Sequence, residues 1–293
     1  MTTYEVGIIG AGPAGIAAAV QLRRSGVRPV VFERGELGGL LRNAGMVENY
    51  PGFPDGIPGR KLVRLMGLQA ERHGVDVLRA GVTAMDFRAG RFRVASEAGE
   101  WRFRRVIVAS GTNPRRFEFE IPASLEGLVH YEIASLLRQS QKTMVVAGGG
   151  EAALDYALTL AGRNRVYLLS RGRGGAFLPA LEARVAAHPR VIRMTNIAIL
   201  GVAPDAGGVA VRCRTAEGPL EIRADEFVGA IGRVPALDFL APGLRRMMPG
   251  LVEEGKIYLA GDVKNGAFRQ TAIAAGDGIA AAMDIRRRKA EGA

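Results

Sequence analysis

Three glycines near the N-terminus have the spacing that places a phosphate at the start of a helix. Residues 10–15 read GAGPAG, the pattern G-x-G-x-x-G, and follow a short apolar run at 4–9. In this pattern the first glycine allows a tight turn, the second lets a pyrophosphate approach the backbone, and the third allows close helix packing. The exposed N–H groups at the helix start bind the anion. The sequence therefore predicts a dinucleotide site at Gly10, Gly12, Pro13, Ala14 and Gly15.

A carboxylate follows at the position that such a site requires. The helix expected at 14–24 ends at Gly26, and a second apolar run at 28–32 ends at Glu33. A carboxylate at the end of this second strand accepts hydrogen bonds from ribose hydroxyls. Strand, helix and acid together form a β-α-β unit. Their combination favours a dinucleotide site over a purely structural glycine turn.

A second glycine turn repeats the arrangement in the middle of the chain. Residues 148–153 read GGGEAA between an apolar run at 143–147 and an expected helix at 152–161. The offset that leads from Gly10 to Glu33 leads from Gly148 to Arg171. An arginine there favours a 2′-phosphate over a free ribose, and hence NADPH over NADH. A solvated arginine pair at a strand end is the alternative. The nucleotide contacts expected here are Gly148, Gly150, Glu151, Ala152, Ser170, Arg171 and Arg173.

The repeated unit predicts an α/β fold with two Rossmann-like, three-layer nucleotide-binding domains. A late strand at 256–260 and a helix at 270–286 have no glycine fingerprint of their own, so we expect them to rejoin the first domain. The second domain is then inserted in the first. The expected boundaries are 1–115 with 237–293 for the discontinuous first domain, and 116–236 for the second.

Further elements follow from the apolar patterns. A helix is expected at 62–73, a hairpin at 91–95 and 101–103, and another buried strand at 105–109. The basic end, 286–293, is expected to be a frayed helix terminus.

Composition limits the kinds of partner. The net charge is +11, but the arginines are scattered and aromatic residues are only 6%. Because single-stranded nucleic acids need aromatic stacking platforms, nucleic-acid binding is disfavoured and acidic small molecules or an acidic electron-transfer protein are favoured. The single cysteine excludes an internal disulfide and a cysteine-built metal site, and no metal is expected. No apolar run is long enough to cross a membrane, and the N-terminus lacks a basic leader, so a cytoplasmic protein is expected.

The chain resembles the low-molecular-weight thioredoxin reductase family of flavoproteins and its thioredoxin-reductase-type ferredoxin/flavodoxin-NADP reductase relatives. The resemblance covers nearly the whole chain, in order. Its motifs are GAGPAG at 10–15, GG at 38–39 with VENYPGFP at 47–54, VIVASGTNPR at 106–115, VVAGGG at 145–150, AIGRVP at 230–235, LAGDV at 259–263, RQTA at 269–272 and AGDG at 275–278. It implies FAD in the first domain, NADP(H) in the second, and a homodimer.

The resemblance also implies roles for individual residues. Glu33 would hold the adenosine ribose of FAD, Asp262 the ribityl chain, and Asn49 would lie near the isoalloxazine. Backbone amides at a helix N-terminus, residues 270–272, would face the pyrimidine edge, where a positive helix end stabilises an anionic reduced flavin. Leu40 stands where the family has a polar residue, so one hydrogen bond to the flavin is expected to be missing. The further FAD contacts implied are Gly38, Gly39, Leu40, Val82, Ser110, Gly111, Gly261, Arg269, Gln270, Thr271 and Ala272.

One departure from the family decides the chemistry. A thioredoxin reductase carries C-x-x-C just before its second glycine fingerprint, and here Glu132 and Ser135 occupy those two positions. Thiol–disulfide exchange needs an attacking thiolate, which neither side chain provides. Cys213 lies in alternating strand sequence and is expected to be structural. Dithiol chemistry is therefore excluded, and His130 with Glu132 is a candidate acid/base pair beside the flavin.

Two functions remain. The first is an FAD-dependent NAD(P)H oxidoreductase that passes electrons to a non-dithiol acceptor such as ferredoxin or flavodoxin, with the flavin itself as the catalytic group. The second is a flavin-binding protein without turnover, a regulator or flavin carrier. It is favoured by residues 170–172, which read SRG where the family has His-Arg-Arg.

Overall fold

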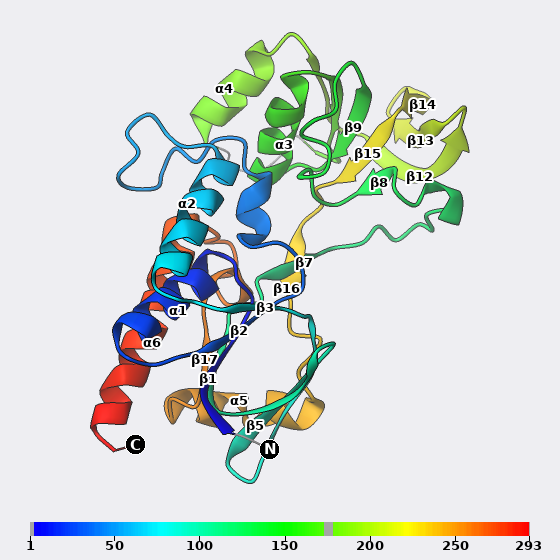
Figure 1. Ribbon diagram of the computed structural model, residues 1–293. Coiled ribbons are helices and arrows are strands. Elements are labelled where there is room, and N and C mark those ends of the chain that lie inside the picture. The colour runs from blue at the N-terminus through cyan, green and yellow to red at the C-terminus, as the bar shows by residue number, and fades with distance from the viewer. Residues whose placement is uncertain (1–2, 173–177, 293) are drawn as a thin grey trace. The chain divides into compact units, whose positions relative to one another are not determined.

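The computed structural model describes residues 3–172 and 178–292 (Figure 1). The chain forms two compact units. The first comprises residues 1–42, 46–113 and 234–293, and the second comprises residues 43–45 and 114–233. The chain thus leaves the first unit and re-enters it, while the expected domain boundaries stay a prediction. The assignment of FAD to one unit and NAD(P) to the other stays a prediction.

A mixed sheet forms the centre of the first unit. Its order is β3-β2-β1-β6-β5-β4, with β17 also paired to β6. β1, β2, β3, β6 and β17 run parallel, while β4 and β5 continue the sheet as an antiparallel hairpin from β6. The strands are β1 (Thr3–Ile9), β2 (Val30–Glu33), β3 (Val77–Arg79), β4 (Val82–Arg88), β5 (Arg91–Ser96), β6 (Gly99–Val108) and β17 (Ile257–Leu259).

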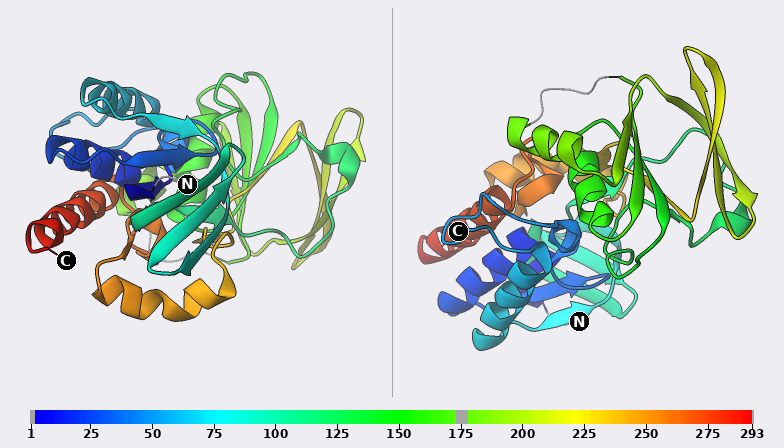
Figure 2. Two further views of the ribbon diagram at one scale, coloured as in Figure 1. Left: turned by 60° about the horizontal axis from the view of Figure 1, so that its bottom comes forward. Right: turned by 90° about the horizontal axis from the view of Figure 1, so that it is seen from above.

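Helices complete the first unit. α1 and α6 lie side by side (Figure 2). Gly278 of α6 allows this close approach, since a Cβ at that position would lie only 2.0 Å from the carbonyl oxygen of Ala14. α5 packs Leu244 and Leu251 against Met85 of β4 and the aromatic core. The helical segments are α1 (Pro13–Arg24), α2 (Gly59–Arg72), α5 (Pro242–Glu253), α6 (Thr271–Ala290) and the 3-10 turns η1 (Gly39–Asn43) and η3 (Gly261–Val263).

The second unit has three layers around a parallel sheet of order β11-β10-β9-β15-β8. Alternate residues of β9 face opposite layers: Met144 and Val146 pack against α3, and Val145 and Ala147 against the small sheet β12-β13-β14. The elements are β8 (Val129–His130), β9 (Thr143–Ala147), β10 (Arg165–Leu169), β11 (Val191–Met194), β15 (Glu226–Gly229), β12 (Ala198–Asp205), β13 (Gly208–Thr215), β14 (Gly218–Ala224), α3 (Glu151–Ala161), α4 (Pro179–Ala187) and η2 (Ala123–Leu125).

A two-stranded ribbon marks the points where the chain passes from one unit to the other. β7 (Thr112–Pro114) pairs with β16 (Arg233–Pro235). Backbone bonds extend the pairing on both sides, from Ala236 N–H to Gly111 and from Arg115 N–H to Gly232.

Two sequence expectations need correction. The hairpin arm at 101–103 and the buried strand at 105–109 are one continuous strand, β6. It pairs with β5 through residues 99–103, with β1 through residues 102–108 and with β17 through residues 106–108. The C-terminal helix does not fray at 286 but continues to Ala290. Ion pairs of Arg287 and Arg288 with Asp284, and of Arg287 with Glu291, lie at helical i,i+3 and i,i+4 spacing and hold its last turns.

Candidate functional site

The first glycine turn has the geometry of an anion-binding turn. A Cβ on Gly10 would lie 2.3 Å from the carbonyl oxygen of Ala109, and a Cβ on Gly15 would lie 1.9 Å from that of Gly10, so packing requires both glycines. A Cβ on Gly12 would meet no other atom within 4 Å. α1 begins there with no side-chain cap. The second glycine therefore leaves open the space beside unused helix N–H groups where a pyrophosphate would bind.

Glu33 lies against this turn. One carboxylate oxygen accepts a hydrogen bond from Ala11 N–H at 2.8 Å and the other accepts one from Gly35 N–H at 2.8 Å. Parallel pairing of β2 with β1 carries the acid to the same end of the sheet as the glycine turn. The two features that the sequence predicts as one dinucleotide site are thus adjacent, although the ribose contact itself stays a prediction.

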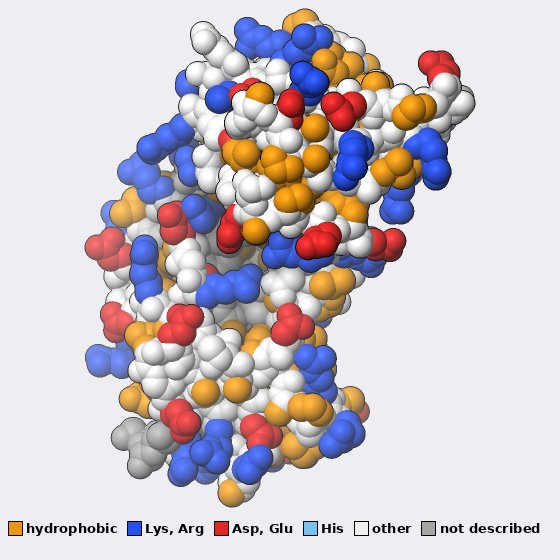
Figure 3. Space-filling model, turned by 90° about the vertical axis from the view of Figure 1, so that its right-hand side faces the viewer, with side chains coloured by type: hydrophobic (Ala, Val, Ile, Leu, Met, Phe, Trp, Pro, Cys, Tyr) orange, Lys and Arg blue, Asp and Glu red, His pale blue; other side chains and the backbone are white. Residues whose placement is uncertain are grey.

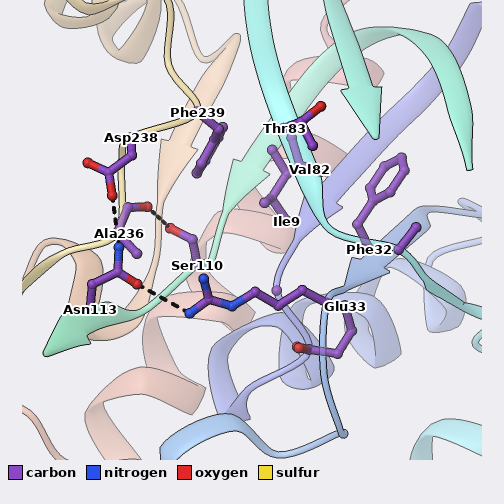
Figure 4. A pocket seen from close by; sticks show the side chains of 13 residues that line it. Ile9, Phe32, Glu33, Val82, Thr83, Ser110, Asn113, Ala236, Asp238 and Phe239 are labelled. Carbon is purple, nitrogen blue, oxygen red and sulfur yellow. Dashed lines mark hydrogen bonds between the residues drawn. The ribbon is translucent and has the colours of Figure 1, made fainter. Parts of the chain in front are cut away.

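A cavity of about 290 Å³ opens beside Gly10 and Glu33 in the first unit (Figure 4). Its apolar lining includes Ile9, Phe32, Val82, Ala236 and Phe239. Its polar lining comprises Glu33, Arg34, Thr83, Ser110, Asn113 and Asp238. Whole-ligand pockets span roughly 300–1,000 Å³, so this volume suits one part of a dinucleotide, such as a base with its ribose.

Hydrogen bonds fix the polar side of this cavity. Ser110 Oγ donates to the carbonyl of Ala236 at 2.7 Å, and Asn113 Nδ2 donates to Asp238 at 2.8 Å (Figure 4). Arg34 donates in turn to Asn113 Oδ1 at 3.2 Å. Val82 and Ser110 were predicted from the sequence as contacts, whereas Arg34, Asn113 and Asp238 were not. Three distant segments meet here, and nothing in their sequence spacing indicates it.

The remaining residues expected at FAD gather around the starts of α1 and α6. Asn49 Nδ2 donates to the side-chain oxygen of Gln270, the residue directly before α6, at 2.9 Å. Gly39 is close to the first turn, since its Cβ would lie 3.6 Å from Gly12 Cα. The positive φ of 97° at Gly38 requires glycine there. Leu40 follows in η1. Thr271 and Ala272 form the first turn of α6, after Arg269.

Asp277 stabilises the turn that carries Asp262. It was not among the contacts predicted from the sequence. It accepts hydrogen bonds from Gly261 N–H at 3.0 Å and Asn265 Nδ2 at 2.7 Å, and it pairs with Lys264 at 2.8 Å. Burial alone would raise the pKa of Asp277, but the hydrogen bonds from these three partners lower it below its ordinary value. The carboxylate stays ionised and ties η3 to α6.

The second glycine turn repeats the geometry of the first. A Cβ on Gly148 would lie 2.3 Å from the carbonyl oxygen of Ala230, whereas one on Gly150 would meet no other atom within 4 Å. α3 begins at Glu151 with no side-chain cap on its N-terminus. Glu151 accepts a hydrogen bond from Leu178 N–H at 3.2 Å, and Ala152 follows it in the first turn.

The residues expected to determine the preference for NADPH over NADH lie just after β10. Ser170 Oγ donates to the carbonyl oxygen of Gly172 at 2.6 Å, and a Cβ on Gly149 would be 3.5 Å from Ser170 Cβ. Arg171 is exposed. Arg173 lies outside the described residues. The 2′-phosphate role of Arg171 stays a prediction.

The proposed acid/base pair of His130 with Glu132 is wrong. His130 Nε2 lies 2.7 Å from Glu226, a buried carboxylate that also accepts a bond from Gln139 at 2.8 Å. β8 runs parallel to β15, and this pairing brings His130 to Glu226. Glu132 instead lies 3.3 Å from Arg233 and accepts a bond of 3.4 Å from Asn43.

Asn43 binds the backbone between Glu132 and Ser135, the two positions at which the family has cysteines. Its Oδ1 accepts hydrogen bonds from Ile133 N–H at 3.0 Å and Ala134 N–H at 2.9 Å. Asn43 is 2% exposed, and Ser135 in the following turn is exposed. This contact could not be predicted from local sequence patterns, because Asn43 and Ile133 are 90 residues apart in the chain.

Cys213 is a structural residue of β13. It is 2% exposed and packs in the apolar core between the two sheets of the second unit. Burial raises the pKa of its thiol to about 11, so the thiolate is scarce at neutral pH. Among the described residues, no three His, Cys, Asp or Glu side chains are grouped as a metal site.

Charge and hydropathy add two observations. On the face drawn in Figure 3, Lys and Arg side chains lie interspersed with acidic and apolar ones. Within residues 3–172 and 178–292, no helix has the length and apolar character to cross a bilayer.

Two α/β units, each with a glycine turn between a parallel strand and a helix, define a protein of the dinucleotide-binding class. Residues 4–278 match the family described as pyridine nucleotide-disulphide oxidoreductase, and the chain belongs to this family. The family's enzymes use FAD and a pyridine nucleotide, which confirms the expected class of flavin-dependent oxidoreductase.

Individual relatives agree with this assignment. The chain is 32% identical over 303 residues to a thioredoxin reductase of Chlamydia pneumoniae, covering 96% of this chain and 97% of the relative. It is also 32% identical to NADPH-dependent thioredoxin reductase 3 of Arabidopsis thaliana, covering 97% of this chain and 58% of that protein. The crystal structure of Lactococcus lactis thioredoxin reductase in its FR conformation superimposes with a TM-score of 0.87 at 25% identity, covering 98% and 99% of the two chains. The expected fold class and family resemblance are confirmed.

Proposed function

We propose that this protein transfers electrons from NADPH through FAD to an acceptor that is not a protein disulfide. The observation that carries the proposal is the pair of residues at the family's cysteine positions. Glu132 is engaged in an ion pair with Arg233, and Ser135 is a hydroxyl. Cys213 cannot replace them, because it is buried in a core with a pKa of about 11. The chain has no sulfur suited to a dithiol relay.

FAD fits the first unit. The space beside Gly12 would admit its pyrophosphate, Glu33 would hold its adenosine ribose, and the cavity next to them would take the adenine. Asp262 would hold the ribityl chain and Asn49 with Gln270 would lie at the flavin end. When bound, FAD accepts a two-electron hydride and releases single electrons, so no protein thiol is required. The protein's part is to bind and orient it, and the N-terminus of α6 would favour its anionic reduced form.

NADPH is the donor we assign to the second unit. The open space at Gly150 and the uncapped start of α3 suit its pyrophosphate. The exposed Arg171, after β10, supplies a cation for a 2′-phosphate where an acid would suit the free ribose of NADH. The Arabidopsis relative described as NADPH-dependent supports the same choice. The net charge of +11 favours an acidic electron-transfer protein as acceptor, and the family resemblance favours a homodimer.

The second candidate is a flavin-binding protein without turnover. It is favoured by the loss of the family's His-Arg-Arg run, of which residues 170–172 keep one arginine. Anaerobic mixing of the FAD-loaded protein with NADPH, and separately with NADH, distinguishes the two. Bleaching of the flavin band by NADPH supports the enzyme, whereas a flavin that stays oxidised at millimolar concentrations of both nucleotides supports the alternative.

A further inference from the structure

A single carboxylate of α6, that of Asp277, holds the turn that contains Asp262. Its Oδ2 atom accepts hydrogen bonds from Gly261 N–H at 3.0 Å and from Asn265 Nδ2 at 2.7 Å, and its Oδ1 atom pairs with Lys264 at 2.8 Å. The Asp277 side chain is 17% exposed, and both hydrogen bonds are partly buried. The carboxylate therefore binds the chain immediately before Asp262 and again shortly after it.

The backbone of the turn depends on this carboxylate. Gly261 is the first residue of η3, so its N–H precedes the hydrogen bonds of the turn and needs a partner outside it. Gly261 is buried, and a Cβ at this position would lie 3.0 Å from the Cβ of Ala14 and 3.4 Å from that of Ala274. A buried N–H without an acceptor is unfavourable. We therefore expect the backbone at 261–263 to shift when Asp277 is removed.

The partners of Asp277 also limit the negative charge beside Asp262. Asp262 and the pyrophosphate expected at Gly12 are both anionic, so a further unpaired carboxylate nearby would oppose FAD binding. The ammonium of Lys264 lies against Asp277 and offsets its charge. Asp277 thus supplies two hydrogen bonds to the turn while adding little net charge to the site.

We propose that Asp277 is a positioning residue that holds Asp262 in place for the ribityl chain of FAD. This inference rests on the proposed binding of FAD in the first unit. Because Asp277 acts through Asp262, its effect is confined to ligands that carry a ribityl chain. FAD and FMN carry one, whereas ADP would bind only through the first glycine turn and the cavity beside it.

The test measures dissociation constants of the full chain for FAD, FMN and ADP, using flavin fluorescence for the flavins and displacement of FAD for ADP. Asp277→Ala should weaken FAD and FMN by the same factor of about ten, the size expected for lost hydrogen bonds to a charged acceptor, and leave ADP unchanged. Asp277→Asn should lose only about threefold, because an amide oxygen in place of Oδ2 still accepts both bonds from the turn.

Three further variants separate positioning from folding. Asp284→Ala removes another carboxylate of α6, which pairs with Arg287 and Arg288, and should lower the unfolding midpoint without changing the three affinities. Asn265→Ala removes one bond to Asp277 and should weaken FAD and FMN about threefold, which tests the proposal even if Asp277→Ala does not fold. The double variant of Asp262→Ala and Asp277→Ala should bind FAD no more weakly than Asp262→Ala alone.

Several outcomes would overturn the positioning role of Asp277. They are unchanged flavin affinities in Asp277→Ala or Asn265→Ala, an equal loss for ADP, an equal loss in Asp284→Ala, and additive losses in the double variant. Wild-type protein that binds FAD while Asp277→Ala binds it equally well would overturn this inference alone. Wild-type protein that takes up neither FAD nor FMN would overturn the proposed function, and this inference with it.

Discussion

The side-chain amide of Asn49 donates a hydrogen bond of 2.9 Å to that of Gln270, 221 residues further along the chain. The bond joins the loop containing VENYPGFP to the residue that precedes α6. Two segments that carry the family resemblance are therefore held together at the helix end where the flavin is expected. The position of the loop is therefore tied to the residue that precedes α6.

This contact predicts a coupled effect on FAD binding. Asn49→Ala and Gln270→Ala should each weaken FAD by roughly fivefold, since one neutral hydrogen bond contributes about 1 kcal/mol. The double variant should lose little more than either single variant, because the interaction is the same one. Fluorescence titration of the three apoproteins with FAD measures this cycle. Fully additive losses would mean that the two residues contact FAD independently.

Because the two glycine turns are expected to bind different cofactors, substitutions in them should weaken FAD binding and NADPH binding separately. Gly12 and Gly150 have negative φ angles and open surroundings, so alanine at either position should fold normally. Gly12→Ala should weaken FAD at least tenfold because the methyl group occupies the pyrophosphate's space. Gly150→Ala should retain FAD and weaken NADPH by a similar factor. Gly15→Ala is the contrasting variant, since its Cβ would lie 1.9 Å from a carbonyl oxygen and should lower the unfolding midpoint. Equal ligand binding in Gly12→Ala and wild type would contradict the assignment.

Local patterns in the sequence were enough to predict these turns. An apolar strand, a glycine turn and a helix are consecutive in the chain, so positions 10–15 and 148–153 could be assigned without knowing the fold. Asn43, Arg34 and Asp238 could not be found in this way, because their partners lie in other segments. The error at His130 has the same origin. Glu132 was predicted as the partner of His130 because the two lie close together in sequence. Strand pairing instead brings His130 to Glu226, 96 residues away.

Arg171 should determine the choice of nucleotide. Arg171→Glu replaces a phosphate-binding cation by a carboxylate and removes a charge-assisted contact of about 1.5–3 kcal/mol. NADPH affinity should fall by roughly one to two decades, while NADH binding is unchanged or improved. Arg212→Glu, on the exposed side of β13, changes the charge equally and is the control. A similar loss for both nucleotides would indicate structural damage, and no loss for either would mean that Arg171 is a solvated surface charge.

The C-terminal helix should give the protein an acid-sensitive component of stability. Burial raises the pKa of Asp284, but hydrogen bonds from Arg288, Arg287 and Tyr258 outweigh it and lower the pKa to about 2. A depressed pKa stabilises the folded state above the unfolded value of about 4, and this stabilisation is lost as the pH falls from there toward 2. With its carboxylate partly solvated, Asp284 should contribute about 1–2 kcal/mol. Urea unfolding of wild type and Asp284→Asn should converge as the pH is lowered through this window. A constant difference between pH 5 and pH 2 would contradict the assignment.

Electrons are expected to leave this protein without passing through a dithiol. The most direct measurement divides one sample of anaerobically NADPH-reduced protein between a one-electron acceptor, ferricyanide or a ferredoxin, and oxidised thioredoxin with insulin. We expect rapid reappearance of the oxidised flavin with the one-electron acceptor and background insulin reduction with thioredoxin, in wild type and in Cys213→Ser alike. Robust thioredoxin reduction that disappears in Cys213→Ser would contradict this expectation.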